Sequence, residues 1–199
     1  MKKQLLFVTL LFIYSFIQAQ TMGTITDTRD GQTYRTVAYE NILLGESVVW
    51  MAQNLNYSTT DSYAYDNNEK YRKNLGLLYT WEAAMKACPR GWHLATDTEW
   101  QTLINDHGGT DDAGKALKGS KGWIDDGNGS NSSGFNALPA GVRYSGGTFG
   151  SLGKIAYCWS ASSSSESRAW EYDLYCSSSR VLRDQSNKEN AYSCRCVRD

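Results

Sequence analysis

The stretch CPRGWHLATDTEW, residues 88–100, decides the fold of this chain because it ends one helix and begins another. Proline lacks an amide donor and glycine is favoured just beyond a helix end, so Pro89 and Gly91 are expected to stop a helix. Thr96 and Glu99 have the spacing of a capping box, in which the hydroxyl and the carboxylate each satisfy an amide group at a helix start. The stretch therefore predicts two consecutive helices joined by a tight link.

Apolar side chains on both sides of this stretch recur at the spacing of one helical face. The first predicted helix has its apolar stripe at Trp81, Ala84, Met85 and Cys88. The second has its stripe at Trp100, Leu103, Ile104 and His107. A glycine pair at 108–109 ends the second helix, and the run DDAGKAL at 111–117 predicts a third, short helix.

Most of the remaining chain alternates apolar and polar residues, which predicts β-strands. These runs cover residues 33–39, 47–55, 156–161, 168–176, 179–184 and 191–199. Two polar segments, 57–74 and 118–151, predict loops, and the second is long enough to carry function. Separate groups of helices and hairpins predict an α+β domain, with two main helices packed on short antiparallel sheets and a long loop region.

The first 19 residues are typical of a cleaved signal peptide. Lys2 and Lys3 precede the uncharged run LLFVTLLFIYSFI, and the small residue Ala19 stands at the expected cut. A polar lead at 20–30 would then precede a single domain at 31–199, a length that suits one hydrophobic core. No second apolar run reaches the roughly 18 residues of a transmembrane helix. We therefore expect an exported protein that is secreted, periplasmic or held at the cell surface.

The charge balance does not indicate a basic surface for binding nucleic acid. Without Lys2 and Lys3, the chain has 18 basic against 21 acidic residues. The seven tryptophans and thirteen tyrosines could form a stacking surface for a ligand. Aromatic side chains more often fill the core, and we expect core packing for most of them.

The five cysteines of an exported chain predict disulfides with one thiol left over. No CxxC pair occurs and the two histidines lie far apart, so a zinc site is not expected. His93, in the predicted link, is interpreted as a buried imidazole bonded to backbone, with a general base as the alternative. His107 is interpreted as a C-terminal cap or a solvated side chain.

Residues 125–131, DDGNGSN, are the one cluster with metal-like chemistry. Calcium takes about six to eight oxygen ligands, and Asp125, Asp126, Asn128 and Asn131 could contribute to such a set. The same residue types build ordinary turns, and the EF-hand spacing and closing glutamate are missing. A plain turn is the preferred interpretation, calcium is the alternative, and no other cofactor is expected.

Several pieces of the chain carry a resemblance to a known family. They are WMAQNLNY (50–57), GLLYTWEAAMKACPRGWHLATDTEWQTL (76–103), GFNALPAGVRY (134–144), CWSASSSSESRAWEYDL (158–174) and SCRCVRD (193–199). The chain resembles the Fibrobacter succinogenes major paralogous domain family, which is common in exported proteins of Bacteroidetes and Fibrobacter. Two positions depart from the family pattern, because Ala95 stands where proline is usual and Cys194 where an apolar residue is usual.

The resemblance implies a fold similar to C-type lectins and, distantly, to formylglycine-generating (sulfatase-modifying) enzymes. In lectin-like domains a cysteine of the first helix pairs with one of the last strand, which implies a disulfide between Cys88 and Cys196. Cys158, Cys176 and Cys194 would then contain at most one further pair. Lectins that bind sugar through calcium use EPN or QPD and WND triplets, and none of these occurs in the sequence.

These expectations favour an exported, non-catalytic, lectin-like module that recognises a glycan or a protein, or helps to build the cell envelope. No constellation of catalytic residues is apparent in the sequence, and a binding site is expected along the loops at 118–151. The alternative is an oxidoreductase related to the formylglycine-generating enzymes, which would use a pair among Cys158, Cys176 and Cys194.

Overall fold

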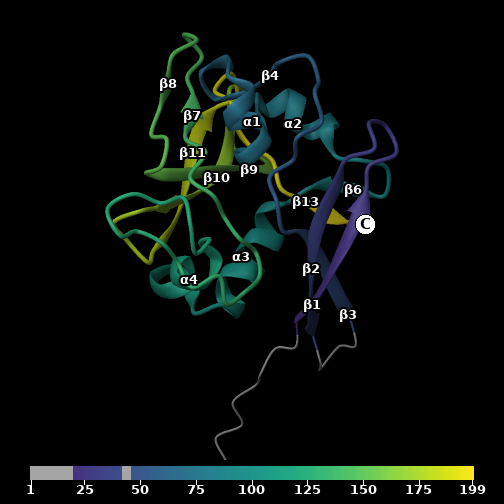
Figure 1. Cartoon of the computed structure of the whole chain (residues 1–199), viewed down its shortest axis with the longest axis vertical. Coiled ribbons are helices and arrows are strands. Elements are labelled where there is room, and N and C mark those ends of the chain that lie inside the picture. Colours follow the sequence, from purple (N-terminus) through teal and green to yellow (C-terminus); the bar gives the residue numbers. More distant parts are fainter. Residues whose placement is uncertain (1–19, 42–45) are drawn as a thin grey trace, which may run out of the picture.

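The computed structural model describes residues 20–41 and 46–199 (Figure 1). The predicted signal peptide, residues 1–19, lies outside the described residues. In the described part of the chain, no helix is both long and apolar enough to cross a membrane. The helices are η1 (Tyr65–Asn67), α1 (Glu69–Leu75), α2 (Trp81–Ala87), α3 (Asp97–Asp106) and α4 (Gly109–Leu117).

The first sheet brings the two ends of the described chain together. Its strands, in spatial order, are β1 (Gln20–Thr26), β2 (Thr33–Asn41), β3 (Glu46–Met51), β13 (Cys196–Arg198) and β6 (Trp92–Leu94). All of these pairs are antiparallel. The C-terminal strand β13 is therefore held between two strands from the first half of the chain.

The second sheet is built mostly from the C-terminal third of the chain. Its strands, in spatial order, are β11 (Val181–Asn187), β10 (Arg168–Tyr175), β9 (Ile155–Ser163), β12 (Tyr192–Ser193), β5 (Leu78–Tyr79) and β4 (Ser62–Tyr63). Only the β12–β9 pair among them is parallel. In Figure 1, α1 and α2 lie above β9 and β10, and α3 and α4 lie below them. A separate hairpin joins β7 (Val142–Arg143) to β8 (Phe149–Gly150), and the whole is the α+β architecture that the sequence predicts.

The capping box predicted at residues 96–99 is present. Thr96 Oγ1 accepts a hydrogen bond from the Glu99 amide at 3.3 Å, and Glu99 Oε2 accepts one from the Thr96 amide at 2.7 Å. Helix α3 therefore begins where the sequence predicts. Its C-terminus is capped by His107, as predicted, with Nδ1 2.8 Å from the Leu103 carbonyl oxygen.

The prediction of two consecutive helices is wrong, because strand β6 lies between α2 and α3. Helix α2 ends at Ala87, and Gly91 adopts a φ of 80° that glycine tolerates. The chain then pairs with β13, so that Leu94 lies opposite Cys196. The local pattern could not reveal this strand, because its partner lies at the far end of the sequence. Met85, predicted on the buried stripe of α2, is 42% exposed.

Two segments predicted as irregular contain regular elements. The predicted loop at 57–74 holds β4, η1 and most of α1. Asn68 begins α1 by accepting a hydrogen bond from the Lys70 amide at 2.9 Å, and Gly76, with a φ of 77°, ends it. The predicted polar lead at 20–30 contains β1, which pairs with β2 along its whole length. The sequence pattern did not reveal β1 or α1, because these two elements carry almost no buried side chains.

The core beside α3 is built on aromatic rings, as predicted. The ring centroid of Trp50 lies 5.0 Å from that of Trp100, and Phe135 lies 5.5 Å from both. Tyr172 stacks on Trp100 at 5.0 Å. All four residues are buried. Because Phe135 belongs to the segment 118–151, part of this predicted loop fills the core instead of covering the surface.

We predict that Thr96→Ala lowers the free energy of unfolding by about 1 kcal/mol, the usual cost of losing an N-cap side chain. The Glu99 amide loses its acceptor, and the reciprocal bond from Glu99 loses its support. Urea unfolding followed by tryptophan fluorescence measures the change. Thr102→Ala, on the exposed face of the same helix, is the control and should shift stability by less than about 0.5 kcal/mol. Equal losses in the two variants would contradict the capping role.

Candidate functional site

A polar pocket with a volume of about 240 Å³ lies between the start of β2, the end of β3 and helix α1. Its lining comes from within four segments, 32–35, 53–56, 72–76 and 136–138. Most of the lining side chains carry an amide, a hydroxyl or a positive charge, and none of them is acidic. The pocket therefore offers hydrogen-bond donors and acceptors in a positively charged setting.

Helix α1 supplies one wall of the pocket through Arg72 and Lys73. Arg72 Nε donates to Asn56 Oδ1 at 2.9 Å, and Asn56 Nδ2 donates to Gln32 Oε1 at 2.7 Å. This chain of hydrogen bonds fixes three lining side chains through contacts within the protein. The backbone of Asn56 is also held in place, because its N–H donates to the Tyr34 hydroxyl at 3.2 Å. The wall is thus pre-organised, which lowers the ordering cost of binding.

Beneath the pocket lies Arg195, whose side chain is fully buried. Its guanidinium donates to Asn54 Oδ1 at 2.8 Å and to the backbone carbonyls of Met51 at 3.0 Å, Phe135 at 2.7 Å and Asn136 at 2.8 Å. Burial lowers the pKa of Arg195 to about 10, so the group remains a cation at neutral pH. Two of its acceptor residues, Asn54 and Asn136, line the pocket, so a buried positive charge lies directly behind the pocket floor.

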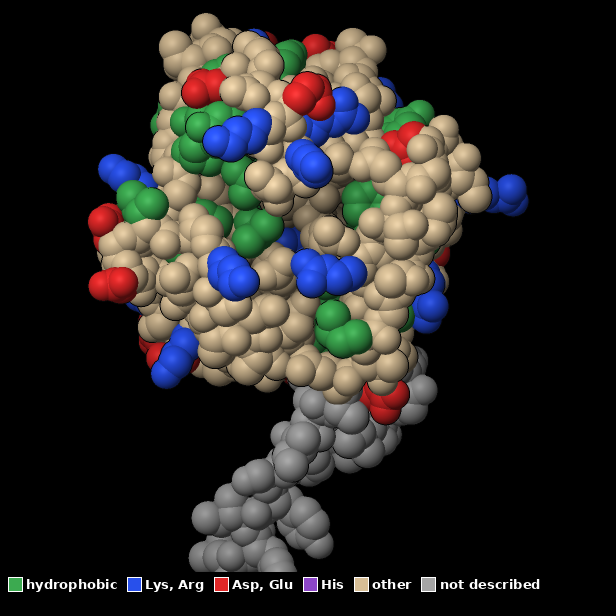
Figure 2. Space-filling view, viewed as in Figure 1, with side chains coloured by type: hydrophobic (Ala, Val, Ile, Leu, Met, Phe, Trp, Pro, Cys, Tyr) green, Lys and Arg blue, Asp and Glu red, His purple; other side chains and the backbone are tan. Residues whose placement is uncertain are grey.

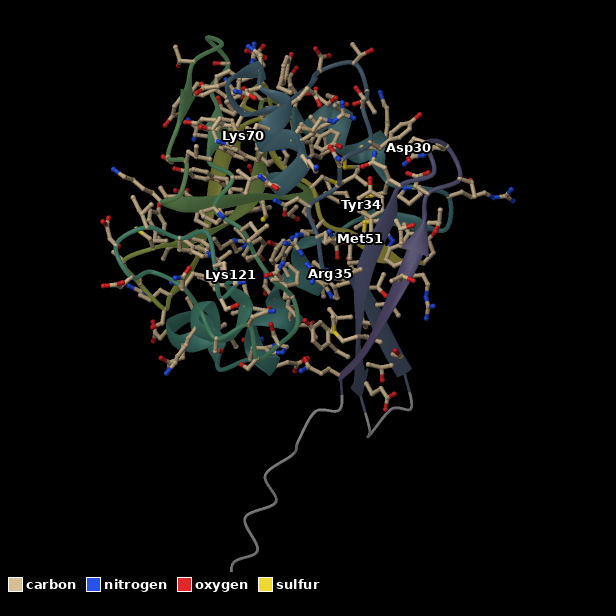
Figure 3. All side chains as sticks on the ribbon, viewed as in Figure 1. Asp30, Tyr34, Arg35, Met51, Lys70 and Lys121 are labelled. Carbon is tan, nitrogen blue, oxygen red and sulfur yellow. A yellow bond between two sulfur atoms is a disulfide. The ribbon has the colours of Figure 1, made fainter. Side chains whose placement is uncertain are left out.

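The pocket opens on a face that is rich in lysine and arginine. Figure 2 shows this face hollowed at its centre, with Lys and Arg side chains around the hollow. In the same view, Figure 3 shows Arg35, Lys70 and Lys121 on this face, from β2, α1 and the segment after α4. Positive charge therefore converges on the hollow from elements that are distant in the sequence.

A second cluster brings three sulfur atoms together. Cys88 and Cys196 form a disulfide, which is the pairing that the family resemblance implied. The Sγ of Cys194 lies 3.8 Å from that of Cys88 and 3.9 Å from that of Cys196. Among the described residues, these cysteines form a group that could hold a metal ion, but two of the three sulfurs are bonded to each other. Cys158 and Cys176 are free, as is Cys194.

A family model for the Fibrobacter succinogenes major domain matches residues 44–198. The chain belongs to this family. Searches of curated proteins and of solved structures found no match. The family match includes the three clustered cysteines and three of the four pocket segments. The remaining pocket segment, 32–35, precedes the match, so this Fibrobacter succinogenes major domain protein completes its pocket with residues from outside the matched region.

Strand β10 carries a buried pair of carboxyl groups on the face opposite Tyr172. Glu171 and Asp173 are only 5% and 4% exposed. One oxygen of each, Glu171 Oε2 and Asp173 Oδ1, has no hydrogen-bond partner among the described residues. Burial disfavours the charged form and raises the pKa of both carboxyls, and the nearby Asp173 raises that of Glu171 further. The pair therefore retains a proton at a pH where exposed carboxyls have lost theirs.

The interpretation of His93 as a buried imidazole bonded to backbone is wrong. Its side chain is 38% exposed on β6 and lies between two carboxylates, with Nδ1 2.7 Å from Asp199 Oδ1 and Nε2 2.9 Å from Glu99 Oε1. Desolvation disfavours the imidazolium, but the hydrogen bonds to Asp199 and Glu99 outweigh it and raise the pKa of His93. His93 therefore links the C-terminal residue to the start of α3.

The residues proposed for calcium form a turn in which the asparagine side chains already bond to backbone. Asn128 Oδ1 accepts from the Trp123 amide at 3.2 Å, and Asn131 Oδ1 accepts from the Asn136 amide at 2.8 Å. Asp125 and Asp126 are exposed with positive φ angles. These contacts fit the preferred interpretation of the stretch as a turn, while the calcium alternative stays a prediction.

A binding site was expected along the loops at 118–151, but only Asn136 and Leu138 of that region line the pocket. Helix α1 and the end of β3 were missed as binding elements. Asn68 and Gly76 were the available signals for α1, since asparagine is a preferred N-cap and glycine a preferred helix stop. No pattern in the sequence indicates that Arg195 would be buried behind these segments.

We predict that Glu171→Gln flattens the pH dependence of stability. A carboxyl whose pKa is raised on folding contributes stability fully below the ordinary value of about 4, and this contribution is lost as the pH rises through the raised pKa. Wild type should therefore lose stability between about pH 5 and pH 8, while the non-ionising glutamine should lose less. Urea midpoints across this range test the idea. Glu166→Gln, at an exposed position before β10, is the control, and its stability should change with pH as that of wild type does. If the stability of all three proteins changed with pH in parallel, the assignment of the effect to Glu171 would be contradicted.

We predict that Cys196→Ser still forms one disulfide, between Cys88 and Cys194. The sulfur atoms of these two residues already lie 3.8 Å apart, and oxidative folding exposes the Cys194 thiol whose pKa burial would otherwise raise. Alkylation of free thiols followed by peptide mapping identifies the bridge. Cys194→Ser is the control and should keep the bridge between Cys88 and Cys196. A fully alkylated Cys88 in the Cys196→Ser protein would show that Cys194 cannot substitute.

Proposed function

We propose that this protein is an exported, non-catalytic binding module with a lectin-like fold, and that the polar pocket is its glycan-binding site. The observation that carries the proposal is the lining of the pocket. Amide side chains at Gln53, Asn56 and Asn74 line the same pocket as the guanidinium of Arg72. Such groups donate to and accept from sugar hydroxyls, and a few well-placed polar groups are what fix a small ligand.

The shape and rigidity of the pocket support the same proposal. Leu75 and Leu138 add apolar surface to the polar lining, which suits the C–H faces of a sugar ring. The hydrogen bonds that hold Asn54, Asn56 and Arg72 are made within the protein itself. A ligand would therefore meet a formed site, which favours recognition over a site that must first fold around it.

The lectin-like fold is proposed on the family resemblance. The α+β architecture and the disulfide between the end of α2 and the last strand fit it. The sequence lacks the calcium-dependent sugar-binding triplets, and the asparagine amides of the candidate calcium turn are used internally. We therefore propose recognition that does not depend on calcium.

The free cysteines favour a binding role over the alternative of a cysteine-based oxidoreductase. Thiol chemistry needs a thiolate that a substrate can reach. Cys158 and Cys194 are both buried, and burial raises the pKa of Cys158 to about 12 and that of Cys194 well above its usual range. The disulfide also fits export, because such bonds persist in oxidising compartments.

A glycan array probed with the protein lacking residues 1–19 tests this proposal. We predict binding to a subset of glycans, and Asn74→Ala should weaken that binding about fivefold, the worth of roughly one hydrogen bond. Asn74 is exposed in the pocket, so its loss should leave the fold intact. Asn105→Ala, exposed on α3 away from the pocket, is the matched control. An array without any bound glycan, or equal affinities for the two variants, would contradict the proposal.

A further inference from the structure

We propose that the ligand of this pocket is an anionic glycan, whose carboxylate or sulfate groups are recognised by Arg35, Arg72 and Lys73. The inference rests on the proposed function and deepens it, because it names the class of sugar. It is carried by two pocket cations without an internal partner, by a third that is bonded mainly to a neutral residue, and by a buried charge behind the pocket floor.

The lining of the pocket has three cationic side chains and no carboxylate. Among the described residues, the side chains of Arg35 and Lys73 take part in no ion pair and no side-chain hydrogen bond. By contrast, Arg29 pairs with Asp27 at 2.6 Å and Arg183 pairs with Asp97 at 2.7 Å. The two pocket cations are therefore available to an incoming anion.

The third cation, Arg72, is oriented but not neutralised. Its Nε and Nη2 donate to the side chain and backbone of Asn56 at 2.9 and 3.3 Å. Its contact with the exposed carboxylate of Glu69 is long, at 3.5 Å, and solvent weakens such a pair. A planar guanidinium held in this way matches the geometry of a carboxylate or sulfate.

Arg195 adds a positive charge that forms no ion pair with any carboxylate of the described residues. Its four acceptors are neutral groups, namely the Asn54 side chain and three backbone carbonyls. Arg35 lies close enough to contribute to the lowering of the pKa of Arg195, so the two cations repel each other across the floor. An anion in the pocket would relieve this repulsion, whereas a neutral sugar would not.

The surface around the pocket carries further positive charge. Lys70 and Lys121 lie on the face onto which the pocket opens (Figures 2 and 3). A glycan with repeated acidic units could therefore contact the pocket with one unit and these lysines with its neighbours. Convergent charge of one sign raises the local concentration of an oppositely charged ligand, and the effect weakens with salt.

Matched pairs of oligosaccharides test the inference. Oligogalacturonate is compared with its methyl ester, and sulfated with unsulfated oligogalactose, by calorimetry at about 20 mM and about 300 mM salt. The acidic member of at least one pair is expected to bind about tenfold more tightly at low salt, and this preference should shrink at high salt. The paired sugars share one backbone and differ only at the acidic group, and the salt dependence of their difference reports its electrostatic part.

The variant Arg35→Gln/Lys73→Gln should remove the preference without lowering the unfolding midpoint, because both side chains are exposed. Lys86→Gln/Arg90→Gln, which removes the same charges from exposed positions at the end of α2, should keep the preference. A preference that survives the first double variant would overturn the assignment of these residues.

The outcomes separate this inference from the proposed function. Neutral and acidic sugars that bind equally, with both affinities reduced by Asn74→Ala, would overturn the anionic inference and leave the glycan-binding proposal standing. If no member of any oligosaccharide pair bound and the array showed no bound glycan, both the anionic inference and the glycan-binding proposal would be overturned. Binding of the acidic members alone, lost with the pocket cations, supports both.

Discussion

The buried guanidinium of Arg195 is the interaction on which the rest of this structure depends. Removing a charge from water costs several kcal/mol unless its hydrogen bonds are replaced. The chain replaces them with acceptors from separate segments: Met51 at the end of β3, Asn54 after it, and the carbonyls of Phe135 and Asn136. The N-terminal sheet, the long loop and the C-terminal strand must therefore all be in place before this charge is satisfied.

This requirement explains why a segment with little regular structure is nevertheless ordered. Within 118–151, one end is held by Lys118, which donates to the carbonyls of Tyr175 and Ser178 at 2.9 and 3.0 Å, and the middle is held by Arg195. Both anchors are cations bonded to backbone carbonyls, which need no specific side-chain partner. Backbone contacts therefore set the position of Asn136 at the pocket.

The sequence predicted the elements whose signals are local. Thr96 and Glu99 begin α3, and alternation marks β9 and β10, because each depends on residues close in the chain. It missed β6, since the strand exists through pairing with β13, and it missed α1, since a helix without buried side chains has no apolar stripe. The pocket was only partly predicted, because its lining comes from four segments that are distant in the sequence. No sequence pattern indicates that Arg195 is buried behind them.

The buried carboxyls of β10 and the buried guanidinium of Arg195 are accommodated in different ways, and the difference bears on the site. The pair Glu171 and Asp173 avoids full charge by retaining a proton, since burial raises the pKa of both carboxyls. Arg195 cannot do the same, because even its lowered pKa leaves it charged at neutral pH. A buried cation that is hydrogen-bonded only to neutral groups still carries a desolvation cost, which a nearby anion can offset. Arg195 lies directly behind the polar pocket, so an anionic ligand bound there would gain from the charge of this guanidinium.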